Sequence, residues 1–183
     1  MSSSDQEIIE DILSGNIERF SEIIDKYKDK IFNICYSFTQ DLYTSQDLTQ
    51  EIFIKIFNNL KNYRFKSSFY TWIFKIASNH CKAWLSKEQR NFVHSFDSEK
   101  ELLVCFKTPE NEYFNNMKIN QIYLELKNMD IKYRIPFWMF YYMDLSYKEI
   151  ANILCIPVRT VETRIYRAKN ILKKRLLELM KDE

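Results

Sequence analysis

The sequence predicts an all-α protein made of two small helical domains. Its 183 residues include one glycine and three prolines, too few to supply the hairpin turns and glycine-dependent loops of a sheet-rich fold. Apolar residues recur instead at helical spacing, and a hydrophobic content of 46% can fill one moderate core or two small ones. The helical pattern loosens after Arg90, which favours two domains over one.

The first two helices are marked by a capping residue and an apolar stripe. Ser4 can cap a helix over residues 5–14, and Gly15 is suited to end it. A second helix is predicted over residues 17–38. Its expected core face is Phe20, Ile23, Ile24, Tyr27, Ile31, Ile34 and Cys35.

Two further helices complete the first domain. Thr44 or Ser45 would cap a third helix that ends near Lys61, and a polar, cationic loop separates it from a fourth helix over residues 68–90. The third helix would bury Leu48, Ile52, Phe53, Ile56, Phe57 and Leu60. Residues 91–111 have mixed polarity and no sustained period, so they are predicted to form a linker.

The second domain is expected to end in a helix-turn-helix. Two helices would precede it, over residues 109–127 and 130–142. Ser146 and Glu149 form an S-x-x-E capping box at the start of its first helix. Pro157 cannot continue that helix but is well placed just before a second one, which starts near Val158. The inward face of the second helix would be Val161, Ile165, Ala168 and Leu172.

The outward face of this last helix is strongly cationic. Residues 159–175 carry seven Lys or Arg side chains against one Glu, a net charge of +6. An α-helix fits the major groove of duplex DNA, so this face is a candidate DNA reader. A solvated basic surface helix is the alternative. The face consists of Arg159, Glu162, Thr163, Tyr166, Arg167 and Asn170.

The formal charge of +2 is divided unevenly along the chain. The net charge is −6 over residues 1–60, +6 over 61–96, −3 over 97–126 and +5 over 127–183. Two basic blocks predict two contacts with nucleic acid, whereas the acidic N-terminal part is expected to face protein.

The third and fourth helices have different outward faces. The third exposes an acidic face with one apolar residue, which is typical of a protein contact: Asp47, Gln50, Glu51, Ile54 and Asn58. The fourth exposes a ridge formed by Ser68, Trp72, Lys75, Asn79, Lys82 and Ser86. Aromatic rings stack on any base while lysines follow phosphates, so the ridge favours unstacked DNA. Alternatively, Trp72 is a core residue and the two lysines are merely solvated.

Several classes of site find no support in the sequence. Cys35, Cys81, Cys105 and Cys155 are too widely spaced for a zinc motif and suit reduced thiols. The chain has no glycine-rich phosphate loop and no hydrolase or protease motif, so no catalytic residue, metal or cofactor is expected. His80 is expected at the core edge. Without a signal segment or membrane span, the protein is expected in the cytoplasm.

Three stretches resemble motifs of one family. DLTQEIFIKIF, at residues 47–57, is similar to a D-L-x-Q-E-x-F-x-K helix. Residues 65–79 follow F-x-x-S-F-x-T-W-I-F-K-I-A-x-N. YKEIANIL and IPVRTVETRIYRAKNIL, within residues 147–172, are similar to a final helix-turn-helix. The chain thereby resembles the extracytoplasmic-function sigma factors of the sigma-70 superfamily.

The resemblance implies an alternative sigma factor that binds core RNA polymerase and directs promoter-specific transcription initiation without bond chemistry of its own. It implies a region 2 helical bundle at residues 1–90, a linker at 91–111 and a region 4 helix-turn-helix at 112–183. The implied partners are core RNA polymerase, promoter DNA and, from the family alone, an anti-sigma factor. A stand-alone DNA-binding regulator and an all-helical interaction protein are the alternatives.

The family also implies residue roles. The clamp helices of the largest polymerase subunit would be contacted by Asp47, Gln50, Glu51 and Ile54. The melted minus-10 element would be held by Phe65, Lys66, Ser67, Ser68, Trp72, Lys75, Asn79 and Lys82. The duplex minus-35 element would be read by Glu162, Thr163, Tyr166 and Arg167, with Arg159, Thr160 and Arg164 on or near phosphates.

Some positions depart from the family pattern. Cys155 stands where the turn usually has glycine, a replacement that costs about 1 kcal/mol if the residue has positive φ. The motif that starts at Phe65 also lacks its usual glycine, and Ala83 and Ser86 replace a usual Asp and Arg. Glu162 often aligns with a basic residue. A carboxylate can accept from cytosine N4 but not from guanine, so an altered minus-35 preference is predicted.

Overall fold

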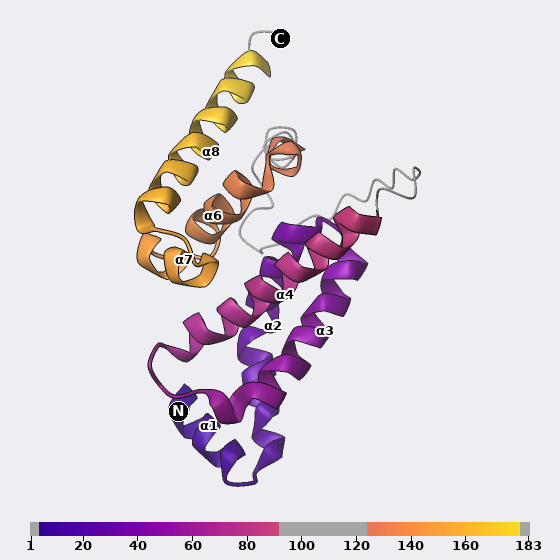
Figure 1. Cartoon of the computed structure of the whole chain (residues 1–183), viewed down its shortest axis with the longest axis vertical. Helices are drawn as coiled ribbons and strands as arrows, with labels where there is room; N and C mark the ends of the chain where they lie inside the picture. The colour runs from indigo at the N-terminus through magenta and orange to yellow at the C-terminus, as the bar shows by residue number, and fades with distance from the viewer. Residues whose placement is uncertain (1–3, 92–123, 180–183) are drawn as a thin grey trace, which may run out of the picture. The chain divides into compact units, whose positions relative to one another are not determined.

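The computed structural model of the protein describes residues 4–91 and 124–179. It divides into two compact units, the first containing α1 to α4 and the second containing most of α6 to α8 (Figure 1). Within the two described ranges every regular element is a helix, which confirms the predicted all-α class. Most of the expected linker and much of the helix predicted over residues 109–127 lie outside the described residues.

The N-terminal helices form much as their sequence dictates. α1 spans Asp5–Leu13, and the Ser4 hydroxyl accepts a hydrogen bond from the backbone N–H of Glu7 at 3.3 Å. Gly15 follows with φ +118°, a conformation that favours glycine. A short 3₁₀ turn, η1 (Ile17–Arg19), leads into α2 (Phe20–Thr39). The predicted core face of α2 is buried or half-buried except at Ile24, which is 36% exposed because it lies at the edge of the stripe.

α3 spans Leu42–Asn59 and begins earlier than predicted. Its cap is Asp41 rather than Thr44 or Ser45: the Asp41 carboxylate accepts from the backbone N–H of Thr44 at 2.8 Å. That bond holds the pKa of Asp41 below its ordinary value. Five of the six predicted core residues are buried, while Phe57 is 37% exposed and packs edge-on against Phe20.

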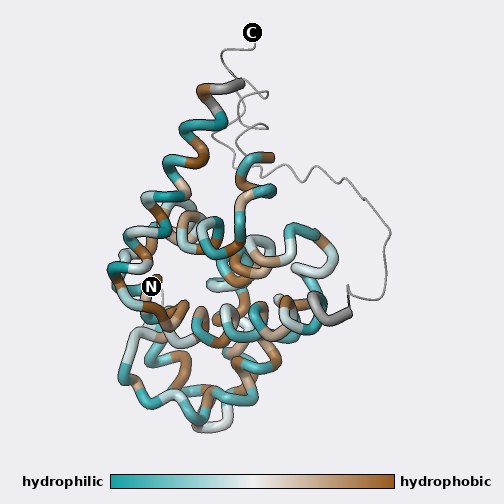
Figure 2. The backbone as a smooth tube through the Cα atoms, turned by 45° about the horizontal axis from the view of Figure 1, so that its top comes forward, coloured by the Kyte–Doolittle hydropathy of each residue, from teal (hydrophilic) through white to brown (hydrophobic). Residues whose placement is uncertain are grey.

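α3 ends in a 3₁₀ turn, η2 (Leu60–Asn62), and α4 then spans Phe69–Asn91. Ser68 caps α4 by accepting from the backbone N–H of Thr71 at 3.2 Å. Apolar side chains from all four helices fill the core of this unit, and Figure 2 shows hydrophobic and hydrophilic segments alternating along the helices. The largest fully buried ones are Ile9, Ile23, Ile31, Ile34, Ile52, Ile56, Leu60, Ile73 and Phe74.

The second unit contains α6 (Ile131–Tyr141), α7 (Tyr147–Leu154) and α8 (Val158–Leu179). Asp130 caps α6 through a 2.9 Å bond from the backbone N–H of Lys132. One hydrophobic cluster joins Leu126, Met129, Trp138, Ala168 and Leu172. The inward face predicted for the last helix is confirmed, because Val161, Ile165, Ala168 and Leu172 are all buried.

Candidate nucleic-acid interface

The helix-turn-helix starts with the predicted capping box. The backbone N–H of Glu149 donates to the Ser146 hydroxyl at 3.3 Å, and the backbone N–H of Ser146 donates to the Glu149 carboxylate at 2.9 Å. These reciprocal bonds satisfy two backbone donors that the first turn of α7 leaves without partners. They fix where α7 begins and so set the path of the chain into the turn that follows.

The turn between α7 and α8 depends on a left-handed residue. Cys155 has φ +57°, a conformation that costs about 1–2 kcal/mol for a residue with a Cβ atom. The next N–H, that of Ile156, donates to the carbonyl of Ala151 at 3.1 Å, which closes the end of α7. The Pro157 carbonyl then accepts from Thr160 at 2.9 Å and begins α8. Cys155 therefore has the positive φ at which the replacement of glycine is expected to cost energy.

The outward face of α8 carries the side chains predicted to read the minus-35 element. Arg159, Glu162, Thr163, Tyr166 and Arg167 are exposed, with Tyr166 at 67%. The remaining two predicted residues, Thr160 and Arg164, are half-buried. The Thr163 hydroxyl donates to the Arg159 carbonyl at 2.8 Å, so its methyl group and oxygen lone pairs remain for contacts with DNA. The structure thus places the predicted residues on the first three turns of α8.

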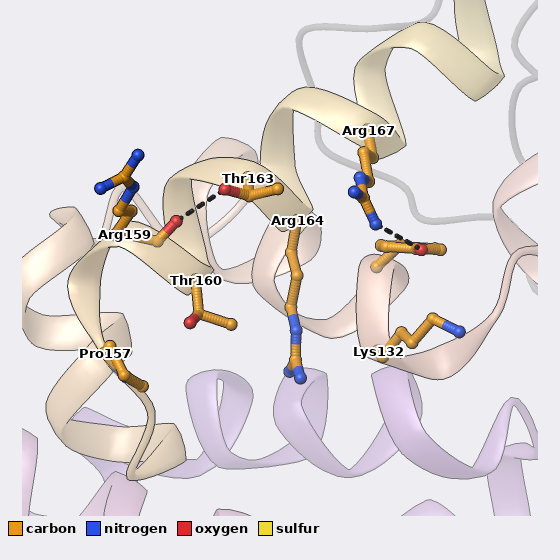
Figure 3. Close-up of a pocket in the computed structure, with 8 residues that line it drawn as sticks. Lys132, Pro157, Arg159, Thr160, Thr163, Arg164 and Arg167 are labelled. Atoms are coloured by element: carbon orange, nitrogen blue, oxygen red, sulfur yellow. Dashed lines mark hydrogen bonds between the residues drawn. The ribbon is translucent and has the colours of Figure 1, made fainter.

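A cationic pocket of about 440 Å³ lies beside this face (Figure 3). The start of α6 contributes Lys132 and Tyr133, and the remaining lining comes from Pro157, Arg159, Thr160, Thr163, Arg164 and Arg167. An Arg167 guanidinium nitrogen lies 3.5 Å from the Tyr133 hydroxyl. Lys132 pairs with Asp130 at 2.7 Å, a contact that lowers the pKa of Asp130. Its four cationic side chains suit the pocket to a phosphate group.

Sequence reasoning missed Lys132 and Tyr133. Both residues belong to a helix whose first turn has no unusual charge density. They join the site because α6 packs on α8, a contact between segments about thirty residues apart. A local pattern could not have found them.

In the first unit, the loop before α4 is built around a buried tyrosine. Tyr63 is 8% exposed, and its hydroxyl donates to the Ser67 carbonyl at 2.6 Å. Burial raises the pKa of Tyr63 above its ordinary value. The ring centroid of Tyr63 lies 4.7 Å from that of Phe65, 5.4 Å from that of Phe69 and 5.2 Å from that of Trp72. Tyr63 therefore organises the aromatic residues of the loop, a role the sequence did not indicate.

Phe65 has the most unusual geometry of this loop. Its φ is +56°, and its side chain is 46% exposed. Glycine adopts this backbone conformation without strain, and the motif that starts here lacks its usual glycine. The chain instead has a large aromatic ring at this position. A strained residue with an exposed aromatic side chain is typical of a functional position.

The ridge of α4 is partly accessible. Lys75 and Asn79 are exposed, as are Lys66, Ser67 and Ser68 before them, whereas Trp72 and Lys82 are half-buried. The Trp72 ring stacks on Phe69 with centroids 5.7 Å apart. Trp72 is thus neither fully buried nor fully exposed, which is compatible with both interpretations of this residue.

The third predicted surface lies on α3. Asp47, Gln50, Glu51 and Ile54 are all exposed, and Ile54 reaches 61%. Asn58 continues the same face. An exposed isoleucine among polar and acidic side chains offers apolar area together with charge, as protein interfaces do.

Other kinds of site find no support among the described residues. There, no three His, Cys, Asp or Glu side chains gather as a metal site would require. Cys35 and Cys81 are buried with sulfur atoms 3.9 Å apart, and both are free thiols. Over the same ranges, no helix combines the length and apolar character needed to cross a bilayer.

Comparison with known proteins places both units in one family. Sigma-70 region 2 matches residues 23–91, and Sigma-70, region 4 matches residues 119–172. The ECF RNA polymerase sigma factor SigW of Bacillus subtilis is 30% identical over 93% of this chain and 96% of its own length. The RNA polymerase sigma-H factor of Pseudomonas aeruginosa is also 30% identical, over 97% of this chain and 96% of its own.

Solved structures share the fold at lower sequence identity. The sigma factor RpoE from Bartonella quintana, solved in complex with the anti-sigma factor NepR, superposes with a TM-score of 0.72 at 18% identity. That alignment covers 86% of this chain and 96% of the other. CnrH, solved in complex with the cytosolic domain of CnrY, gives a TM-score of 0.69 at 19% identity, covering 97% and 99%.

Proposed function

The chain belongs to the sigma-70 family, as an alternative sigma factor of the extracytoplasmic-function type that directs transcription initiation, and we propose that its two units divide this work. The first unit, with a boundary near residue 90, binds core RNA polymerase and the opened minus-10 element. The second, from about residue 112, binds the duplex minus-35 element, and residues 91–111 connect them. The factor contributes binding energy and no bond chemistry.

Polymerase binding is assigned to α3. The family implies Asp47, Gln50, Glu51 and Ile54 at this surface, and the 61% exposure of Ile54 supports the assignment. Burying an apolar side chain against a partner is favourable by roughly 1.5–3 kcal/mol when it is fully covered. The acidic neighbours add selectivity for a basic partner surface.

Capture of the melted minus-10 strand is assigned to the loop around Phe65 and to the α4 ridge. The exposed Phe65 ring and the half-buried Trp72 indole provide stacking surface, which is worth roughly 1–3 kcal/mol per base. Lys66 and Lys75 are both exposed and suit the sugar-phosphate backbone. The stacking energy offsets the few kcal/mol needed to unstack each base.

Recognition of the minus-35 element is assigned to the outward face of α8. The observation that carries this proposal is the burial pattern: one face of α8 is fully packed, and the other presents arginines, Glu162 and Tyr166 to solvent. The pocket that Lys132 completes supports a phosphate contact beside the reading residues. Glu162 is proposed to accept from cytosine N4 and so to alter the preferred base there.

One location and one further partner belong to the same proposal. We place the protein in the cytoplasm, where its polymerase partner is found. An anti-sigma factor is proposed as a regulator, supported by the family and by the fold shared with RpoE, which was solved in complex with the anti-sigma factor NepR.

In vitro transcription with purified core polymerase tests the function. Run-off assays on genomic fragments should give promoter-specific transcripts only when core and this protein are combined. The Ile54→Asp variant should lose transcription and core binding, whereas Ile17→Asp, at a similarly exposed isoleucine outside α3, serves as the matched control. A footprint on duplex DNA without polymerase would favour a stand-alone regulator instead, and failure to bind either partner would indicate an interaction protein.

A further inference from the structure

His80 bridges two charged residues on the outward face of α3. Its Nε2 lies 2.7 Å from a carboxylate oxygen of Glu51, and its Nδ1 lies 2.6 Å from the Lys55 ammonium nitrogen. The imidazole comes from α4 and is 12% exposed, while the Glu51 side chain is 58% exposed. Glu51 and Lys55 are one helical turn apart, a spacing at which they could pair directly. The ring stands between them instead.

The geometry dictates the form of the imidazole. An ammonium group has only donors, so Nδ1 must accept the hydrogen bond from Lys55. A carboxylate only accepts when ionised, so Nε2 must carry the proton that it donates to Glu51. When both bonds are made, Nδ1 accepts and the ring proton lies on Nε2. Both of its nitrogen atoms are used, and each charged partner is held by a bond from a largely buried side chain.

The consequence concerns the surface proposed to meet polymerase. Exposed Glu and Lys side chains normally sample many rotamers, and ordering each one opposes binding. Here the ring fixes both before any partner arrives. Asn79, the residue before His80, lies on the ridge proposed to hold the melted strand. One turn of α4 thus contributes to the DNA surface and supports the polymerase surface on the neighbouring helix.

We propose that His80 is a positioning residue for polymerase binding, which preorganises Glu51 and Lys55 on α3 through its two ring nitrogens. The proposal rests on the assignment of α3 as the polymerase surface. It names a residue that contacts neither DNA nor polymerase itself. Any side chain that supplies one donor and one acceptor at the same places should perform the same task.

Two substitutions of His80 distinguish the effect of its hydrogen bonds from the effect of its side-chain volume. His80→Leu introduces an apolar side chain of similar size and removes both bonds, and should weaken binding to core polymerase about tenfold because two side chains must then be ordered on docking. His80→Gln retains an amide donor and a carbonyl acceptor, and should stay within about twofold of the parent protein. Fluorescence anisotropy with labelled full-length protein measures both affinities, and thermal unfolding verifies that each variant is folded.

A mutant cycle tests whether His80 acts on polymerase binding through Glu51 and Lys55. In a Glu51→Ala, Lys55→Met background, His80→Leu should cause no further loss of affinity, because the residues that it positions are gone. A second tenfold loss in that background would overturn the proposal. It is equally overturned if folded His80→Leu binds like the parent protein, or if folded His80→Gln binds as weakly as His80→Leu.

Nitrogen-15 NMR of the imidazole gives a readout that bulk packing would not move. Nδ1 should show the shift of an unprotonated acceptor and Nε2 that of a protonated nitrogen, and a proton on Nδ1 would overturn the proposal. The chain has two histidines, so the His80→Gln variant assigns the signals. The Ile54→Ala variant distinguishes failure of the α3 assignment from failure of the His80 role. Normal polymerase binding by Ile54→Ala would exclude α3 as the polymerase surface. Weak binding by Ile54→Ala together with normal binding by His80→Leu would overturn only the positioning role of His80.

Discussion

The loop before α4 and the turn before α8 share one uncommon feature and use it differently. Each contains a bulkier residue than glycine in the left-handed region, Phe65 with φ +56° and Cys155 with φ +57°. The backbone penalty is of the same order at both, about 1–2 kcal/mol. Each turn leads directly into a helix that the proposed function places on DNA.

The two residues differ in what their side chains do. The Phe65 ring packs against Tyr63 at 4.7 Å, a contact of a kind worth about 0.5–1.5 kcal/mol. Cys155 has only a 3.7 Å contact from its thiol to the Asn152 carbonyl, which is a weak hydrogen bond. Strain is therefore largely offset at Phe65 and mostly uncompensated at Cys155. We infer that Phe65 is kept for its exposed ring, whereas Cys155 is tolerated.

Replacing Phe65 should have the largest effect. Phe65→Gly removes a stacking ring, so affinity for a single-stranded minus-10 oligonucleotide should fall by about 1–3 kcal/mol, roughly 5- to 150-fold. Stability should change by less than about 1 kcal/mol, because relief of strain balances the lost ring contact. Fluorescence titration and thermal unfolding measure the two quantities. Phe65→Tyr keeps the ring and is the control; unchanged binding by the glycine variant would end the distinction between the two turns.

Removing the Tyr63 hydroxyl should have the next largest effect. Tyr63→Phe keeps the ring contacts but loses the hydrogen bond to the Ser67 carbonyl, which should destabilise the first unit by about 1 kcal/mol. The Ser67 carbonyl can turn to water, so the loss should not exceed that value by much. Denaturant unfolding gives the difference. If the loss disappears in the Phe65→Gly background, the bond serves mainly to hold Phe65 in its strained conformation.

Cys155→Gly should stabilise the protein slightly without affecting promoter recognition. Glycine relieves the left-handed strain but loses more chain entropy on folding, so the net gain should be at most about 1 kcal/mol. The exposed thiol contributes no contact that DNA binding requires under this interpretation. Thermal unfolding together with a minus-35 gel shift provides the measurement. A clear drop in promoter affinity would show that this residue, like Phe65, is kept for its side chain.

The smallest expected effect is on the salt dependence of DNA binding, which should differ between the two regions. Arg159→Ala should reduce the slope of log affinity against log salt for duplex minus-35 DNA by about 0.9 if the residue meets one phosphate. Lys66→Ala should reduce the slope for single-stranded minus-10 DNA by about 0.7. Lys28, which pairs with Asp25 on α2, is the control position, and Lys28→Ala should leave both slopes unchanged. Equal effects on duplex and single strands would contradict the proposed division.

Local signals in the sequence located most of the helices. Ser4 and Ser146 cap helices as expected because a cap acts on N–H groups within three residues of itself. The exception is α3, which is capped by Asp41 rather than by Thr44 or Ser45. The backbone of Asp41 is extended, and its carboxylate accepts from the backbone N–H of Thr44 in the first turn. The outward faces of α3 and α8 also followed from helical periodicity.

Contacts between distant segments could not be predicted in this way. Ile24 and Phe57 have the spacing of core residues, and only the packing of neighbouring helices leaves them partly exposed. Tyr133 joins the pocket, and His80 stands between Glu51 and Lys55, because residues 25 to 34 positions apart in the chain are brought together by helix packing.

By itself, the sequence determined the helical class, the Ser4 cap, the Ser146–Glu149 capping box and the outward face of α8, because each depends on interactions within one or two helical turns. The tertiary structure alone decided the backbone conformation of Phe65, the central place of Tyr63 in its loop and the hydrogen-bonded form of His80. Those features depend on which side chains meet across helix interfaces, and a one-dimensional pattern does not contain that information.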